Sequence, residues 1–269
     1  MTTDSTLTKF GFRFGRNGAH AARTMMLGEL RTLFNHQPET ATKTDYRREV
    51  VESNVLGKPT RKARELAFGH LADLYGLAPE LAAFRAFRKL WMQDSDAQPV
   101  LALTLALVRD PLLRRSREFM LAKQPGEAVR REELEALLSR DDPGRFSPAS
   151  LKSFAQNING TWTQAGFLTG RSRKTRAVPR ITPANVTFAL FLGYLEGFTG
   201  QSLFTSAWMK LLPGSPDELE GLANSASHRG QNRVHERGGR QGSALPWLPH
   251  SRRRAHPPRG FPCRLRSPN

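Results

Sequence analysis

The segment Arg145–Arg180 reads RFSPASLKSFAQNINGTWTQAGFLTGRSRKTRAVPR, and it predicts a helix, a short extended run and a basic loop, in that order. It lies in a window without carboxylates, because the next acidic residue after Asp142 is Glu196. The cations of this window are Arg145, Lys152, Arg171, Arg173, Lys174, Arg176 and Arg180. A local excess of positive charge is typical of surfaces that bind nucleic acid. The alternative is a solvated basic surface without a ligand.

The helix of this segment is predicted to begin at Ser147 and Pro148, because Ser is favoured as N-cap and Pro at the first helical position. Apolar residues then recur every three or four positions and form one core face: Leu151, Phe154, Ala155, Ile158 and Trp162. The run Ala165–Leu168 is expected to lead into a short strand, and Gly170–Pro179 to form a basic hairpin. This order predicts a winged helix-turn-helix-like, DNA-binding segment over residues 143–214.

The other faces of this helix carry polar side chains of the types that contact DNA. Asn and Gln pair bidentately with adenine, and Thr reaches phosphate or base. Arginines of the hairpin contact phosphates or enter a minor groove. The candidate DNA-binding residues are Lys152, Gln156, Asn157, Asn159, Thr163, Arg171, Arg173, Lys174, Arg176 and Arg180. The alternative for the Asn and Gln residues is an ordinary hydrated helix face.

Residues 21–139 predict six or seven helices, with short joints rich in Pro and Gly and no convincing strand. One of these helices covers Thr60–Tyr75, with Thr60 as its N-cap. The strongly apolar run Val100–Val108 is predicted to be the central core helix. Such a series of helices buries a core only as a helical bundle. With Asp141–Gly144 as the boundary turn, residues 1–142 are predicted to be an ordered N-terminal arm and a helical bundle.

The C-terminal part of the chain has a different character. The formal net charge of the 269 residues is +17, and the segment 225–269 contributes +9, because it holds ten arginines and a single carboxylate. Residues 215–269 show no apolar periodicity, so we expect a disordered basic tail there. One hypothesis is that the chain beyond about Asn224 is a reading frame translated out of phase. The other is a basic tail that adds nonspecific DNA affinity.

The sequence lacks the motifs of common enzymes and metal sites. It contains no Gly-x-Ser-x-Gly motif, no HExxH motif and no Walker lysine. Its one cysteine, Cys263, excludes an internal disulfide and a Cys-rich metal site. We therefore expect no catalytic activity, no metal and no cofactor. Because no apolar run approaches the ~20 residues of a membrane span, we expect a cytoplasmic protein without membrane contact.

Several short motifs follow one another over about residues 10–212. They are Thr24–Leu27, Ser53–Lys62, Leu74–Leu77, Phe146–Lys152, Gln156-Asn157 and Trp162–Leu168. In this layout the chain resembles the BrxA family, the small helical component of BREX phage-defence systems. The resemblance implies an all-helical protein similar to the RNA-binding antitermination factor NusB, with a winged-helix part that binds double-stranded DNA. It also implies work alongside a methyltransferase, an ATPase and a phosphatase-like protein, without catalysis of its own.

We therefore predict a mainly α protein, in which a helical bundle is followed by a winged helix-turn-helix-like segment and a disordered basic tail. The predicted function is non-enzymatic DNA binding within a BREX anti-phage system. Two alternatives remain open. One is a winged-helix transcriptional regulator that acts at an operator. The other is a protein-interaction scaffold whose basic hairpin contacts an acidic partner.

Overall fold

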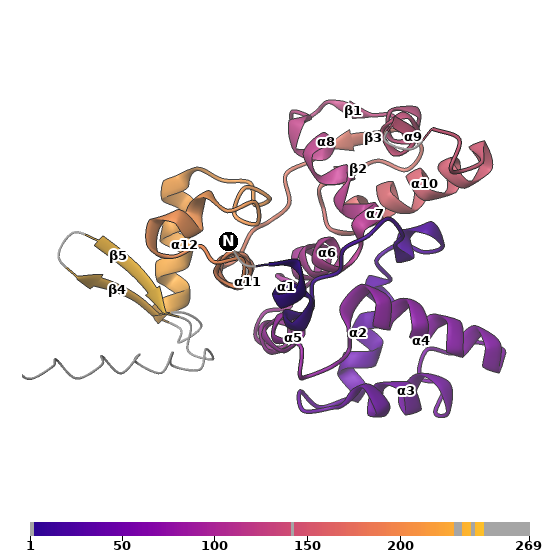
Figure 1. The fold of residues 1–269 in the computed structure, drawn as a ribbon, viewed down its shortest axis with the longest axis horizontal. Helices are drawn as coiled ribbons and strands as arrows, with labels where there is room; N and C mark the ends of the chain where they lie inside the picture. The colour runs from indigo at the N-terminus through magenta and orange to yellow at the C-terminus, as the bar shows by residue number, and fades with distance from the viewer. Residues whose placement is uncertain (1–2, 141–142, 229–232, 238–239, 245–269) are drawn as a thin grey trace, which may run out of the picture.

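The computed structural model describes residues 3–140, 143–228, 233–237 and 240–244 (Figure 1). These residues are mainly α-helical, with twelve α-helices and a small three-stranded antiparallel sheet. The α-helices are α1 Asp4–Phe10, α2 Leu27–His36, α3 Lys43–Val51, α4 Arg61–Tyr75, α5 Ala82–Gln93, α6 Gln98–Arg109, α7 Pro111–Arg114, α8 Ser116–Ala122, α9 Arg131–Arg140, α10 Pro148–Gln164, α11 Pro183–Leu195 and α12 Pro216–His228. The short 3-10 helices and the strands are η1 Ala19–Ala21, η2 Gly200–Thr205, β1 Ala128–Val129, β2 Leu168–Thr169, β3 Lys174–Arg176, β4 Arg233–Arg237 and β5 Arg240–Ala244.

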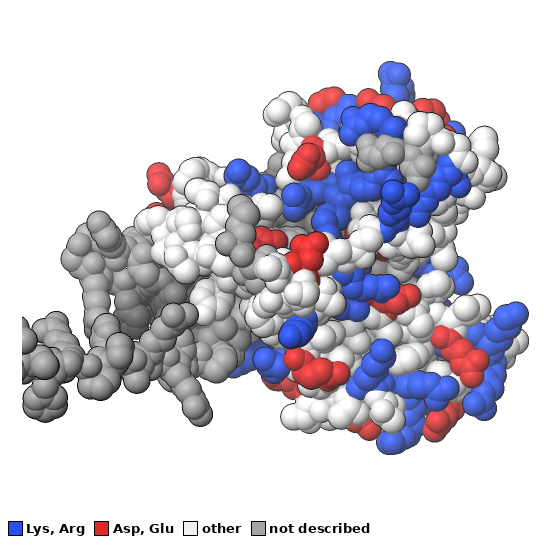
Figure 2. Space-filling model, viewed as in Figure 1, with Lys and Arg blue, Asp and Glu red and all other residues white. Residues whose placement is uncertain are grey.

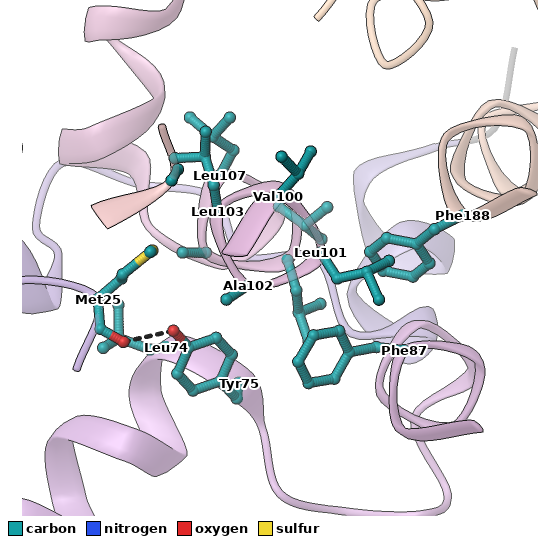
Figure 3. Close-up of a cluster of buried hydrophobic side chains, with 14 of the residues drawn as sticks. Met25, Leu74, Tyr75, Phe87, Val100, Leu101, Ala102, Leu103, Leu107 and Phe188 are labelled. Atoms are coloured by element: carbon teal, nitrogen blue, oxygen red, sulfur yellow. Dashed lines mark hydrogen bonds between the residues drawn. The ribbon is translucent and has the colours of Figure 1, made fainter. Parts of the chain in front are cut away.

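Helix α6 lies at the centre of the molecule and packs against α4, α5, α10 and α11. Every residue of Val100–Arg109 is buried, which confirms the predicted central core helix. Figure 3 shows side chains from separate parts of the chain converging on it, among them Tyr75, Phe87 and Phe188. The rings of Tyr75 and Phe87 stack with their centroids 5.8 Å apart. The core therefore joins helices that lie far apart in the sequence.

Helices α2, α3 and α4 form a lobe below the core in the view of Figure 1. Helix α4 begins where the sequence predicts, because the Thr60 hydroxyl accepts a hydrogen bond from the Ala63 backbone N–H at 3.1 Å. The buried guanidinium of Arg88 donates to the carbonyls of Phe34 and Gln37, at 3.1 and 2.7 Å. It thereby satisfies the free carbonyls at the end of α2, as helix termini require.

The three-stranded sheet has the order β1-β3-β2. Strand β3 pairs with β1 through Ala128 and Thr175, and with β2 through Leu168 and Arg176. The prediction that residues 21–139 contain no strand is wrong at β1. This strand has only two residues, which is too short to show an alternating pattern in the sequence. The sheet also joins segments on both sides of the predicted boundary at residue 142.

Helix α11 returns to the core, where it packs on α5 and α6, and α12 packs on α11. Burial of Leu219, Ala223 and Ala226 anchors α12. The disorder predicted from residue 215 is therefore wrong for Pro216–His228, whose apolar residues find a partner face in the folded chain. Strands β4 and β5 pair as an antiparallel hairpin. Residues 229–232, 238–239 and 245–269 of the predicted tail lie outside the described residues.

The N-terminal arm before α2 is ordered and packs on the body, as predicted. Phe12 is buried, with its ring edge-to-face against Trp208 at 6.0 Å. The Arg13 backbone N–H donates to the Val108 carbonyl at 3.2 Å. Further along, η1 contacts both α4 and α10, so the arm crosses between these two helices (Figure 1).

Candidate nucleic-acid interface

Helix α10 turns its apolar face into the core, as its sequence predicts. The Trp162 indole N–H donates to the Ser116 hydroxyl at 2.9 Å, and its ring packs edge-to-face against Phe167. On the opposite side, Lys152 and Gln156 are exposed to solvent. The two residues lie one helical turn apart on the same face, four positions apart in the sequence. They are the two predicted helix residues that remain available to a large ligand.

The N-terminal arm covers a neighbouring face of α10. The Asn157 amide donates to the His20 carbonyl at 3.0 Å, and the Gln164 amide donates to the Thr24 hydroxyl at 3.2 Å. Between them, Gly160 leaves only enough room for the arm, because a Cβ there would lie 2.9 Å from the Thr24 methyl group. Asn157, predicted to contact a base, instead positions the arm while its side chain stays half-buried.

A buried chain of hydrogen bonds locks the arm in this place. His20 Nδ1 lies 2.8 Å from Asp110 Oδ2, and His20 Nε2 lies 2.7 Å from Thr161 Oγ1. All three side chains are at most 1% exposed, so no substrate reaches them in this conformation, although an Asp–His–Thr set resembles a catalytic triad. No local sequence pattern marks this cluster, because Asp110 and Thr161 lie 90 and 141 positions after His20.

Asp110 connects this hydrogen-bond network to the helical core. Burial raises the pKa of its carboxyl, but hydrogen bonds from His20 and from the Leu113 N–H, together with the His20 charge, outweigh burial and hold the pKa below its usual 3.8. Its Oδ1 accepts from the Leu113 N–H at 2.9 Å, which makes it the N-cap of α7.

Two further predicted contacts of α10 are turned away from solvent. Asn159 is buried, and its Oδ1 has no hydrogen-bond partner among the described residues. Thr163 is half-buried, and its hydroxyl donates to the Asn159 carbonyl one turn earlier, at 2.7 Å. The prediction that Asn159 contacts DNA is wrong in this conformation, because it lies at the edge of the core face rather than on the polar face.

The β2–β3 hairpin projects a cationic turn. Arg171 and Arg173 are exposed, and neither guanidinium has a hydrogen-bond or ion-pair partner among the described residues. The Lys174 ammonium donates to the Gly170 carbonyl at 2.7 Å and so closes the turn. Gly170 has a φ of +89°, and a Cβ there would lie 2.0 Å from the Arg173 carbonyl oxygen. Only glycine therefore fits this turn.

The prediction that Arg176 contacts DNA is wrong for this conformation, because the residue is buried and only 7% exposed. Its guanidinium donates to the carbonyls of Met120, at 3.2 Å, Phe167, at 3.1 Å, and Ala177. It also lies 5.0 Å from the centre of the Phe167 ring. Burial lowers the pKa of Arg176. This arginine fastens α8 to the strands and serves the fold.

Arg180 is exposed but paired. Its guanidinium lies 2.7 Å from Asp96 Oδ2, a carboxylate of the turn before α6. The sequence window without carboxylates hides this contact, because Asp96 is 84 positions away. Exposed ion pairs of this kind contribute little to stability, about 0–1 kcal/mol. The ion pair with Asp96 therefore does not prevent the Arg180 guanidinium from binding a DNA phosphate instead.

Lys and Arg side chains form a band over the part of the molecule that holds α7 to α10, as Figure 2 shows. Over α3 and α4, Asp and Glu alternate with them. No group of three or more His, Cys, Asp or Glu side chains suited to a metal ion occurs in the described part of the chain. No helix among the described residues is both long and apolar enough to cross a membrane. The chain matches no family model, and it matches no curated protein in sequence.

Proposed function

We propose that residues 116–176 form a winged helix that binds duplex DNA. Support comes from the order α8, β1, α9, α10, β2, β3 and from the sheet order β1-β3-β2. A winged helix has this succession of helix, strand, two helices and a two-stranded wing, with the last strand in the middle of its sheet. In this arrangement α10 takes the place of the recognition helix, and the turn around Arg171 is the wing.

The exposed side chains suit this arrangement. Recognition helices contact base edges with their N-terminal residues, and on α10 the exposed Lys152 and Gln156 lie in the first nine residues. Arg171 and Arg173 on the wing contact phosphates, which fixes the orientation of the protein on the duplex. The observation that carries the proposal is this combination of topology with a cationic, carboxylate-free wing.

We further propose that the protein is a non-enzymatic component of a BREX-type phage-defence system. The support is the likeness of its motifs to the BrxA family, together with a helical body that carries the winged helix. The partners implied are a methyltransferase, an ATPase and a phosphatase-like protein. Adjacent genes for a methyltransferase and a large ATPase are the expected neighbourhood, and a neighbourhood without them contradicts this assignment.

The DNA-binding proposal is tested by measuring the affinity of the full chain for a labelled duplex over a salt series. Each phosphate contact contributes about 0.9 to the slope of log affinity against log salt. We expect the double variant Arg171→Ala/Arg173→Ala to lower this slope by about 1.8. The matched control is Lys9→Ala/Lys210→Ala, which removes two exposed cations away from α10 and is expected to keep the slope.

The outcomes separate the remaining alternatives. Protection of one defined sequence in a footprinting experiment favours a transcriptional regulator. Binding that is absent at low salt, or indifferent to salt, contradicts the DNA proposal and favours a scaffold that contacts an acidic protein. An equal loss of slope in the Arg171/Arg173 variant and in the control contradicts the assignment of the wing.

A further inference from the structure

A polar cavity of about 330 Å³ lies beside the exposed face of α10. It is bounded by the N-terminal arm, by α2 and α4, and by α10 itself. Its polar lining residues are Arg23, Thr24, Glu29, Lys58 and Asn157. Asn157 belongs to α10, so the cavity continues from the proposed DNA-binding helix toward the α2–α4 lobe.

The charges of the cavity leave one cation uncompensated. Lys58 Nζ lies 3.1 Å from Glu29 Oε1, and both side chains are about one-third exposed. The side chain of Arg23 is exposed, and its guanidinium has no hydrogen-bond or ion-pair partner among the described residues. A guanidinium favours phosphate because it offers planar, bidentate hydrogen bonds. The net charge at this place therefore suits an anionic ligand.

The backbone around the cavity is held in an unusual conformation. Met26 and Asn54 have φ values of +52° and +55°, and in the described part of the chain only one other non-glycine residue, Leu77, has a positive φ. Asn54 Oδ1 accepts from the Lys58 N–H at 2.8 Å and so fixes the loop that carries this lysine. Such strained positions persist where the surrounding structure holds them, and they concentrate at functional sites.

We propose that DNA bound on α10 also contacts Arg23 and Lys58 through its phosphates. The DNA surface then extends from the winged helix across the N-terminal arm to the loop before α4. This inference rests on the proposed function, and it goes beyond it by assigning DNA contacts outside the winged helix. The buried hydrogen bonds between His20, Asp110 and Thr161 would then have a role in DNA binding, because they hold the arm, and with it Arg23, beside α10.

The test is a salt series with a labelled duplex, using the full chain and its Arg23→Gln and Arg23→Gln/Lys58→Gln variants. We expect the slope of log affinity against log salt to fall by about 0.9 for the single variant and about 1.8 for the double variant. The matched control Lys9→Gln/Lys210→Gln is expected to keep the slope. Because the Arg23 guanidinium has no hydrogen-bond or ion-pair partner among the described residues, the single variant decides the question even where loss of Lys58 loosens the loop.

A second readout is the titration of His70 by nuclear magnetic resonance. Burial lowers the pKa of His70, and the charge of Arg23 lowers it further. A phosphate placed at Arg23 offsets that charge, so we expect duplex DNA to raise the pKa of His70. A merely structural role for Arg23 predicts no such change on binding.

The two proposals fail in distinguishable ways. If the Arg23 and Lys58 variants keep the wild-type slope while Arg171→Ala/Arg173→Ala lowers it, the extended surface is wrong and the winged helix stands. If the wild-type protein does not bind duplex DNA, the proposed function is wrong and this inference falls with it.

Discussion

Arginines within six positions of one another have opposite roles in this protein. Arg171 and Arg173 are exposed in the turn between β2 and β3, whereas Arg176 is buried and donates to three backbone carbonyls. The same residue type is therefore exposed at the two positions that we propose to contact DNA, and it stabilises the fold at the third. Removing a buried donor leaves its acceptors without partners, which is more damaging than removing an exposed charge.

We expect Arg176→Ala to lower the free energy of unfolding by about 3 kcal/mol, because carbonyls of α8 and the strands lose their donor. Arg171→Ala is the control and is expected to change it by less than about 0.5 kcal/mol. Urea denaturation followed by circular dichroism measures both values. Equal stability of the two variants would show that the contacts of Arg176 do not hold the sheet.

Asp110 gives the protein a predicted dependence on acid pH. Because its folded pKa lies below the ordinary value of 3.8, its contribution to stability is fully present above that value and is lost as the pH falls through the folded pKa. We expect Asp110→Asn to be less stable by about 2 kcal/mol near neutral pH. The difference from the wild type should shrink below pH 3.8. Denaturation curves over a pH series test this, and a difference that is constant down to acid pH contradicts it.

At the scale of elements, the faces of α10 have different surroundings. The face that carries Lys152 and Gln156 is free, while the face around Gly160 receives the N-terminal arm. The helix is thus held on two sides, by the core through Trp162 and by the arm through Thr161. If α10 binds DNA as proposed, a helix held in this way would lose little conformational entropy on binding.

The β2–β3 hairpin, which is the proposed wing, depends on a single glycine, Gly170. At a φ of +89°, and with a Cβ only 2.0 Å from the Arg173 carbonyl, Gly170→Ala cannot keep the present turn. We expect this variant to lose about 1–3 kcal/mol of stability locally and to bind DNA with a lower salt slope, because Arg171 and Arg173 move. Hydrogen exchange of the β2–β3 amides and the duplex salt series measure the two effects.

The control for this variant is Gly69→Ala. Gly69 lies inside α4, where nothing stands within 4 Å of the added Cβ. Alanine is favoured over glycine there, so we expect a gain of about 0.5–1 kcal/mol and unchanged DNA binding. A wing variant that behaves like this control would mean that the hairpin does not contact the ligand.

At the scale of the whole molecule, the segment 116–176, which we propose to be a winged helix, packs against the helical core through α10 and α6. Helix α6 contacts α4, α5, α10 and α11, and the arm lies between α4 and α10. A ligand bound across α10 and the arm would therefore contact two parts of one packed body. This arrangement favours a fixed footprint over a flexible one.

Deletion of the basic C-terminal segment tests which part of the chain provides the affinity for duplex DNA. Residues 245–269 carry six arginines and no carboxylate. We expect their deletion to weaken nonspecific binding and to lower the salt slope, since each phosphate contact contributes about 0.9. The further loss caused by Arg171→Ala/Arg173→Ala should persist in the shortened chain. Disappearance of that loss would place the binding site in the tail.

Local sequence patterns alone predict the helical class, the central helix α6, the capped starts of α4 and α10, and the hairpin after Gly170. These features follow from local causes, namely apolar periodicity, caps and glycine turns. Tertiary structure alone decided that Arg176 and Asn159 are buried, that Asp96 reaches Arg180, and that the arm covers part of α10. Each of these depends on packing between residues distant in the sequence, which no local pattern records. For the same reason the carboxylate-free window Arg145–Arg180 indicated a basic surface, whereas only the fold showed which of its cations remain exposed.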